Sequence, residues 1–97
     1  MSVKVILSVT TKADATQSFL DELKRMLPET RQFKGCLGLN VFQHQDNPAQ
    51  VTLIEEWESK EDYEAYFAYR GEAGDLDIIM PMFEGEPSIS YLDLVKI

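Results

Sequence analysis

The fold of this chain is decided by the stretch Val51-Thr52-Leu53-Ile54-Glu55-Glu56-Trp57-Glu58-Ser59-Lys60-Glu61-Asp62-Tyr63. Its first half is an apolar, strand-like run that ends in two carboxylates and the only tryptophan of the chain. Ser59 then opens a helix-like stretch with three acids behind it. A strand that delivers a large aromatic side chain to the start of a helix builds one wall of a pocket.

The region before this stretch predicts one strand and one helix. Residues 3–10 alternate between two faces, which is the pattern of a strand. Asp14 followed by Gln17 resembles a capping box, and the apolar residues behind it recur at helical spacing. Pro28 should end or kink this helix, because its ring clashes with the carbonyl four residues earlier, and Glu29 to Phe33 could carry one more turn.

The remaining elements complete a βαββαβ order. A second strand is predicted over 37–43, and a turn at Asp46-Asn47-Pro48 joins it to the third strand, 50–57. A helix follows from about 60 to 70, then a short helix within 76–83 broken by Pro81, and a last strand over 88–95. This order predicts the α+β class and a ferredoxin-like antiparallel sheet with helices on one face.

Length and charge narrow the function. A chain of 97 residues forms one domain, here 1–97. Seventeen acids against nine bases give a net charge of −8, which argues against nucleic acid and anionic membranes as partners. No apolar run approaches the roughly 20 residues that span a bilayer. A single cysteine and the lack of a secretory leader pattern predict a cytoplasmic protein without an intrachain disulfide.

The strands are apolar on both faces: Ile6 opposes Val5, and Ile54 opposes Leu53. Helices from one chain can cover only one face of a sheet, and an exposed apolar face favours aggregation. We therefore expect a homodimer in which the sheet of a second chain covers the other face.

With these elements in place, the chain resembles the antibiotic biosynthesis monooxygenase domain family of dimeric α+β barrels. The resemblance covers nearly the whole chain and rests on four pieces: Thr30-Arg31, Gly35-Cys36-Leu37-Gly38, the block 51–61, and Pro87 before the last strand. It implies a cofactor-free oxygenase of quinols or aromatic polyketides. The family also holds haem-degrading enzymes, isomerases and members without known activity.

The chain departs from the family pattern at several positions. Many members have a histidine where this chain has Tyr66, and members that oxidise polyketides have an asparagine where it has Leu53. Asn40 on the neighbouring strand could supply that amide if its side chain points into the pocket. Haem-degrading members need residues that are absent here, so haem is not the expected substrate.

The resulting hypothesis is a cofactor-independent monooxygenase that acts on a small aromatic or quinol ring. An alternative is a non-catalytic binding module or an isomerase-like member of the same fold, so enzyme activity is left open. The expected catalytic residues are Trp57, Tyr66 and Arg70. The expected substrate contacts are Tyr63, Asn40, Phe42, Phe67 and Phe83.

Each of these residues also has a plain structural interpretation. Trp57 and Phe67 could be core aromatics, and Arg70 could form a surface salt bridge with Glu72 or another nearby acid. His44 reads as a solvated turn residue and Cys36 as a small buried thiol. The sequence offers no metal-ligand cluster and no cofactor-binding motif, so neither a metal nor a cofactor is expected.

Overall fold

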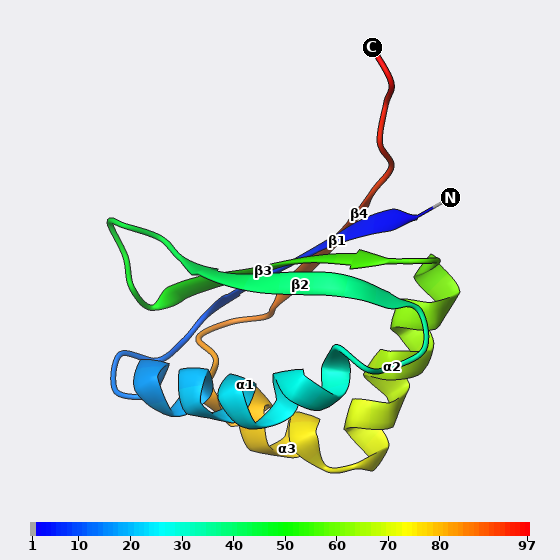
Figure 1. Ribbon diagram of the computed structural model, residues 1–97. Coiled ribbons are helices and arrows are strands. Elements are labelled where there is room, and N and C mark those ends of the chain that lie inside the picture. The colour runs from blue at the N-terminus through cyan, green and yellow to red at the C-terminus, as the bar shows by residue number, and fades with distance from the viewer. Residues whose placement is uncertain (1) are drawn as a thin grey trace.

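The computed structural model describes residues 2–97, and it consists of a four-stranded antiparallel sheet with helices on one face (Figure 1). The elements are β1 (Val3–Thr10), α1 (Thr16–Thr30), β2 (Cys36–Gln43), β3 (Gln50–Trp57), α2 (Lys60–Glu72), α3 (Asp75–Ile79), the 3-10 helix η1 (Met80–Met82) and β4 (Ser88–Leu92). The strands lie in the order β2-β3-β1-β4. The predicted ferredoxin-like α+β fold is confirmed.

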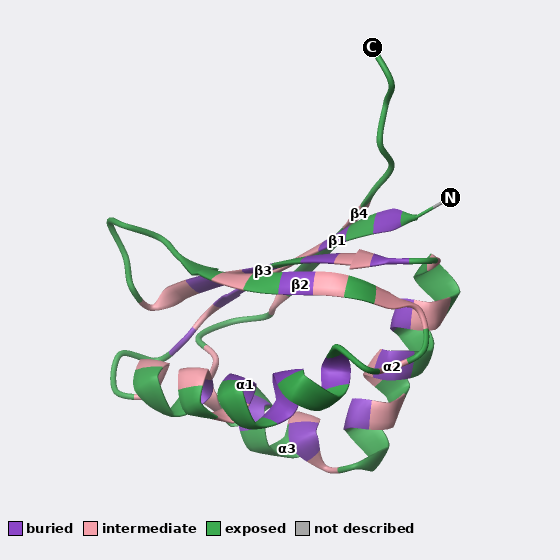
Figure 2. Ribbon diagram, in the orientation of Figure 1, coloured by how far each residue is buried: buried purple, intermediate pink, exposed green. Residues whose placement is uncertain are grey.

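The core lies between the sheet and the helices, and the strand β3 shows why. Because side chains alternate along a strand, Val51, Leu53, Glu55 and Trp57 share one face, and all four are buried. The opposite face of β3 is half-buried or exposed (Figure 2). The segment that decides the fold thus supplies the floor of the core.

The start of α1 differs from the prediction. The helix begins at Thr16 with Ala15 as its N-cap, and no side chain caps it, so the capping box predicted at Asp14 is wrong. A turn precedes the helix, in which the Ala15 amide donates to the carbonyl of Lys12 at 2.9 Å. This turn occupies Asp14 and moves the N-cap one residue later, to Ala15.

Pro28 lies inside α1, and the helix ends two residues later at Thr30. Proline removes the hydrogen bond to the carbonyl of Lys24, but Lys24 is exposed and water can serve that carbonyl. Only two residues follow Pro28 before the helix ends, so the penalty falls on its last turn.

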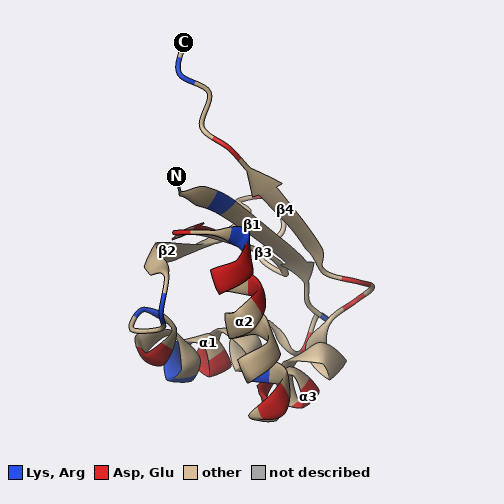
Figure 3. Ribbon diagram, turned by 90° about the vertical axis from the view of Figure 1, so that its right-hand side faces the viewer, with Lys and Arg blue, Asp and Glu red and all other residues tan. Residues whose placement is uncertain are grey.

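The start of α2 agrees with the sequence. Ser59 is the N-cap, with its hydroxyl accepting a hydrogen bond from the amide of Asp62 at 3.1 Å. Glu61 and Asp62 lie in the first turn, where the helix dipole favours negative charge. Acidic residues recur along α2 and α3, whereas the strands carry few charges (Figure 3).

The last strand is shorter than expected. It ends at Leu92, and residues 93–97 leave the sheet as an extended tail that points away from the helices (Figure 1). Leu94 and Val95 are 79% and 71% exposed. Strand β4 pairs only with β1, and β1 begins at Val3, close to the last pair, Lys4 with Leu92. The residues after Leu92 therefore have almost no strand beside them with which to form backbone hydrogen bonds.

The approach of β2 to α2 is set by Gly35. Its φ angle is +90°, and a Cβ atom there would lie 2.5 Å from the Cβ of Asp62. Its carbonyl accepts a hydrogen bond from the amide of Glu58 at 2.8 Å. Gly35 therefore allows the start of β2 to sit against the junction between Trp57 and α2.

We predict that Gly35→Ala lowers the free energy of unfolding by roughly 2–4 kcal/mol, because it adds a steric clash to a left-handed backbone. Gly74→Ala is the matched control, since Gly74 has a φ of +87° but no atom within 4 Å of its would-be Cβ. Urea unfolding of both variants measures the difference. Equal losses would mean that the contact with Asp62 relaxes freely.

Candidate functional site

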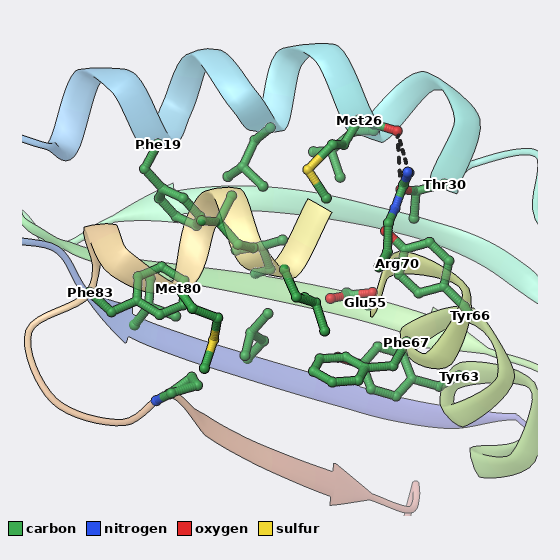
Figure 4. A pocket seen from close by; sticks show the side chains of 18 residues that line it. Phe19, Met26, Thr30, Glu55, Tyr63, Tyr66, Phe67, Arg70, Met80 and Phe83 are labelled. Carbon is green, nitrogen blue, oxygen red and sulfur yellow. Dashed lines mark hydrogen bonds between the residues drawn. The ribbon is translucent and has the colours of Figure 1, made fainter. Parts of the chain in front are cut away.

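A cavity of about 60 Å³ lies between the sheet and the helices. Side chains from α1, α2, the strands β1 and β3, and the segment 76–87 line it (Figure 4). Most of them are aliphatic or aromatic. The polar lining side chains are Thr30, Glu55, Tyr63, Tyr66 and Arg70. An apolar cavity with a few convergent polar groups is the usual form of a small-molecule site.

The segment 75–83, here called the cover, closes one side of this cavity through Leu76, Ile79, Met80 and Phe83. Gly74 before it and Gly85 after it both have positive φ angles, of 87° and 78°. Met80 is 47% exposed although it lines the cavity. The cover is therefore a thin wall between the cavity and solvent, bounded by two residues of high conformational freedom.

The cavity as it stands is smaller than an aromatic ring needs. A protein cavity of about 150 Å³ holds one benzene, and this one measures about 60 Å³. A ring can enter only if lining side chains move. The cover is the part of the wall with the least packing on its outer side.

Arg70 is buried at the inner end of the cavity, and all five of its N–H groups are used. Nε donates to the Tyr66 hydroxyl at 2.9 Å, and the two Nη2 bonds go to the Met26 carbonyl and the Thr30 hydroxyl. Nη1 donates to Glu29 at 3.0 Å and to Asp75 at 2.8 Å. A guanidinium has no sixth donor. Arg70 therefore offers no free hydrogen bond to a ligand in this conformation.

Asp75 is the buried partner of this arginine and begins the cover. It also accepts a hydrogen bond from Arg25 at 2.8 Å. Burial opposes ionisation of Asp75, but the hydrogen bonds from Arg25 and Arg70 outweigh it and hold its pKa below the ordinary value. The cover is thus attached to α1 and α2 by charge pairs at its first residue.

Tyr66 lines the cavity with its hydroxyl engaged. The oxygen lies 2.6 Å from the Thr30 hydroxyl and accepts from Arg70. Burial raises the pKa of Tyr66, against the opposing effect of the Arg70 and Thr30 hydrogen bonds. The hydroxyl is therefore neutral at physiological pH. Its hydrogen bond from Arg70 fixes the position of the Tyr66 ring in the cavity wall.

Three of the other expected contacts meet at the cavity as well. Tyr63, Phe67 and Phe83 all line it, and Phe83 packs edge-on against Phe19 with ring centroids 5.3 Å apart. Burial raises the pKa of Tyr63 well above its usual range, and the nearby Glu55 carboxylate adds to this effect.

Trp57 does not line the cavity. It is completely buried behind the lining, with its ring 5.2 Å from that of Tyr66 and 5.6 Å from that of Tyr63. Its Nε1–H donates to Glu55 Oε1 at 2.9 Å. In this structure the indole supports lining side chains and has no surface of its own in the cavity.

Asn40 and Phe42 lie on the other face of the sheet. Both are exposed, and the register pairs Asn40 with Ile54 and Phe42 with Thr52, which also face away from the helices. Strand parity fixes this outcome, because buried Leu39 takes the inward position between them and the bulge at the start of β2. Neither side chain reaches the cavity.

The sequence analysis did not select Glu55, which is the only carboxylate that residues 2–97 contribute to the cavity wall. Glu55 is 3% exposed and points into the cavity from the second half of β3 (Figure 4). Burial raises its pKa, and the hydrogen bond from Trp57 only partly opposes this. The signal was available, since Glu55 shares the alternation of Val51, Leu53 and Trp57.

His44 and Cys36 both lie outside the cavity lining, and Cys36 is half-buried rather than buried. His44 is exposed in the turn after β2, as predicted. Within residues 2–97, no group of three or more His, Cys, Asp or Glu side chains is arranged to hold a metal ion. Across the same residues, no helix combines the length and the hydrophobicity needed to cross a bilayer.

The family follows from a comparison with protein-family models. The model of the antibiotic biosynthesis monooxygenase family matches residues 2–69, which include the Trp57 block and most of α2. The chain belongs to this family. Membership supports a monooxygenase-like function. No curated protein matches the chain.

Solved structures give the same fold at low sequence identity. An antibiotic biosynthesis monooxygenase shares 23% identity with a TM-score of 0.87, over 97% of this chain and 99% of its own. A conserved protein from Methanosarcina mazei Go1 shares 21% with a TM-score of 0.86, covering 95% and 91%. A protein from Shewanella oneidensis shares 19% with a TM-score of 0.81, covering 94% and 88%. These likenesses establish the fold.

We predict that Arg70→Met lowers the free energy of unfolding by about 3–5 kcal/mol, because it leaves Asp75 and several buried acceptors without their main donor. Arg25→Met is the matched control: it removes the other partner of Asp75 from the half-exposed side of the pair, and it should cost far less. Chemical denaturation compares them. Similar losses would show that Arg70 is not the central bond of the cluster.

Proposed function

We propose that this protein is a monooxygenase that oxidises a small phenol or hydroquinone with dioxygen and without a metal or flavin. The observation that supports this most is the apolar, aromatic-walled cavity with a single carboxylate in its wall. Aromatic side chains that meet edge-on or tilted favour a flat ring as their ligand. The reaction class comes from the family.

Oxygenation of a phenol requires few groups from the protein. A phenol that loses its hydroxyl proton becomes an electron-rich anion, which can give one electron to dioxygen. The radical and superoxide then combine at a ring carbon that carries hydrogen. The resulting hydroperoxide regains a proton and loses water, which leaves a quinone. One oxygen atom enters the ring and the other leaves as water, so no external reductant is needed.

Within this proposal the expected site residues on the helix side of the sheet divide into two groups. Tyr63, Tyr66, Phe67 and Phe83 contact the ring. Trp57 and Arg70 act through their neighbours, because the indole lies behind the lining and every Arg70 donor already has an acceptor. The cover opens to admit the ring and closes again to exclude water from the anion.

A binding module without catalysis is the second candidate. One observation favours it: no cation in the cavity wall has a free donor with which to stabilise a substrate anion. The two candidates make different predictions for dioxygen consumption, although both predict that rings bind.

We further propose that the protein works as a homodimer whose sheets pack against each other. The face of the sheet away from the helices carries Phe42, Ile54 and Leu92, which are 49%, 37% and 49% exposed. The tail, 93–97, which includes the exposed Leu94 and Val95, extends from the end of β4. A second copy would cover both, and its tail would reach toward the first chain.

For the reaction, we predict that metal-free and flavin-free protein consumes dioxygen and forms quinone in equal amounts when given hydroquinones or anthrones. Phe67→Ala should weaken ring binding about tenfold, because it removes an aromatic contact worth roughly 1–1.5 kcal/mol. Tyr69→Ala, on the same helix but outside the cavity lining, is the control and should bind as the wild type does. If the rings bind but none of them leads to oxygen uptake, the oxygenase is refuted and the non-catalytic binding module is favoured.

For assembly, we predict that light scattering at micromolar concentration gives twice the 11.1 kDa of one chain. Ile54→Asp should halve that mass, because it would bury an unpaired charge in the interface. Ile78→Asp is the control: it makes the same change at a residue that is 46% exposed on α3. A wild-type mass of one chain, or no difference between the two variants, would refute face-to-face pairing.

A further inference from the structure

Glu55 is a buried carboxylate without a charged partner. It sits in the middle of the sheet, opposite Val5 of β1 and Leu39 of β2, and it is 3% exposed. Its one hydrogen bond comes from Trp57 Nε1 to Oε1, at 2.9 Å. Burying a carboxylate in such surroundings is expensive, and most proteins pair it with a cation. The fold retains it unpaired, which points to a use.

The second oxygen of Glu55 is available to a ligand. Oε2 accepts no hydrogen bond from residues 2–97, and among those residues no fully enclosed side-chain oxygen or nitrogen lacks a partner. Because Glu55 lines the cavity, we infer that Oε2 opens into it. Figure 4 shows the Glu55 carboxylate among the lining side chains. A ligand hydroxyl in the cavity has this atom as its free acceptor.

The titratable groups around Glu55 leave its basicity intact. Helix α2 contributes Tyr63, Tyr66 and Arg70 to the cavity wall. The Cys36 thiol of β2 lies outside the wall but close enough for the charge of Glu55 to affect it. The two phenols and the thiol have raised pKa values, with burial as the largest cause, and stay neutral. Arg70 directs its donors to other acceptors. The side chains of β1, α1 and the cover that line the cavity carry no titratable group.

We propose that Glu55 is the catalytic base, which accepts the hydroxyl proton of the substrate on Oε2. This rests on the proposed oxygenation of a phenol. In the step, the O–H bond of the phenol breaks and an O–H bond to Glu55 forms. The cavity holds one negative charge before and after the transfer. The neutral carboxyl can then donate a hydrogen bond to the phenolate, and later it returns the proton to the peroxide.

Trp57 is the positioning residue of this pair. Its indole N–H holds Oε1, which fixes the carboxylate plane and leaves Oε2 toward the cavity. Because burial raises the pKa of Glu55, the carboxylate is a stronger base than a surface glutamate. The difference between the pKa of Glu55 and that of a phenol, which is about 10, is therefore smaller, and this favours proton transfer to Glu55. The Trp57 hydrogen bond acts in the opposite direction and sets how far the pKa rises.

The first test needs no dioxygen, so it stands apart from the proposed oxygenation. A nitrophenol is mixed with the protein under anaerobic conditions in a weak buffer, at a pH below the phenol's own pKa. With wild type we expect the bound ligand to show its phenolate absorption while no proton is released to the buffer. Glu55→Gln keeps the shape and an acceptor for Trp57. It should bind the neutral phenol, or bind phenolate with release of one proton. Wild type that behaves as Glu55→Gln does would overturn the proposal.

The second test uses turnover. Glu55→Gln should lower kcat for oxygen uptake by about 10²–10⁴-fold, the usual contribution of a general base. Trp57→Phe removes a donor that lowers the pKa of Glu55, so the acid limb of the pH profile should move to higher pH with its alkaline plateau retained. Tyr69→Phe, a hydroxyl loss outside the cavity, should leave the limb in place. An unmoved limb in Trp57→Phe, or full activity in Glu55→Gln, would refute the assignment.

Folding of the glutamine variant provides an internal check. A raised pKa means that the folded chain binds the Glu55 proton more tightly than the unfolded chain does. Stability due to this group is therefore greatest at low pH and falls as pH rises from the ordinary value of 4.5 through the folded pKa. Glu55→Gln should abolish this fall and be more stable than wild type at pH 8. A variant that is less stable at pH 8 would contradict an uncompensated carboxylate.

If wild type consumes no dioxygen with any ring tested, the oxygenation fails while the nitrophenol experiment still decides whether Glu55 accepts a proton. If oxygen is consumed but the nitrophenol binds in the same form to wild type and Glu55→Gln, the oxygenase stands and Glu55 is not its base.

Discussion

The guanidinium of Arg70 is the interaction on which the arrangement of the helices depends. Its five hydrogen bonds reach α1 at Met26, Glu29 and Thr30, α2 at Tyr66, and the cover at Asp75. Helix α1 contains Pro28 in its last turn, which removes one backbone hydrogen bond there. Donation from Arg70 to the Met26 carbonyl and the Thr30 hydroxyl serves that turn from outside the helix. The same side chain attaches the cover, and so the cavity exists because three elements share one cation.

Arg70 and Glu55 face the same cavity and represent opposite electrostatic solutions. Arg70 is fully compensated: two carboxylates, a phenol, a hydroxyl and a carbonyl use every donor. Glu55 receives one hydrogen bond from an indole and has apolar strand neighbours. A compensated buried charge holds structure together but has nothing left to offer a ligand. An uncompensated one destabilises the fold and stays reactive. Arg70, which the sequence analysis named as a catalytic residue, thus has no free donor. Glu55, which it did not name, has a free acceptor oxygen, Oε2.

Local patterns predicted much of the fold and part of the site. Alternation located β1, and apolar runs with turn signals located the other strands. Ser59 located α2, and the face formed by Tyr63, Tyr66 and Phe67 does line the cavity. The errors lie where distant contacts decide. The plain interpretation of Arg70 was a surface salt bridge with Glu72 or another nearby acid, whereas the fold buries its guanidinium between Asp75 and Glu29. The register of β2 sets the side of Asn40, and that register depends on a bulge that no local pattern signals.

The two ends of the cover are attached to the rest of the fold in different ways, and these attachments determine how a ring could enter. Its first residue, Asp75, is buried and bound to two arginines. Near its other end, Phe83 forms a bridge with Thr11, and the Lys12 amide donates to the Met82 carbonyl at 2.8 Å. Between these attachments Ile78 and Met80 are 46% and 47% exposed, and Pro81 removes a backbone donor. A flexible methionine in the wall can swing out at less cost than breaking either attachment. Entry of a ring therefore requires the centre of the cover to yield while Asp75 stays in place, which leaves the Arg70 cluster, and with it the position of Tyr66 opposite Glu55, undisturbed as the cavity opens.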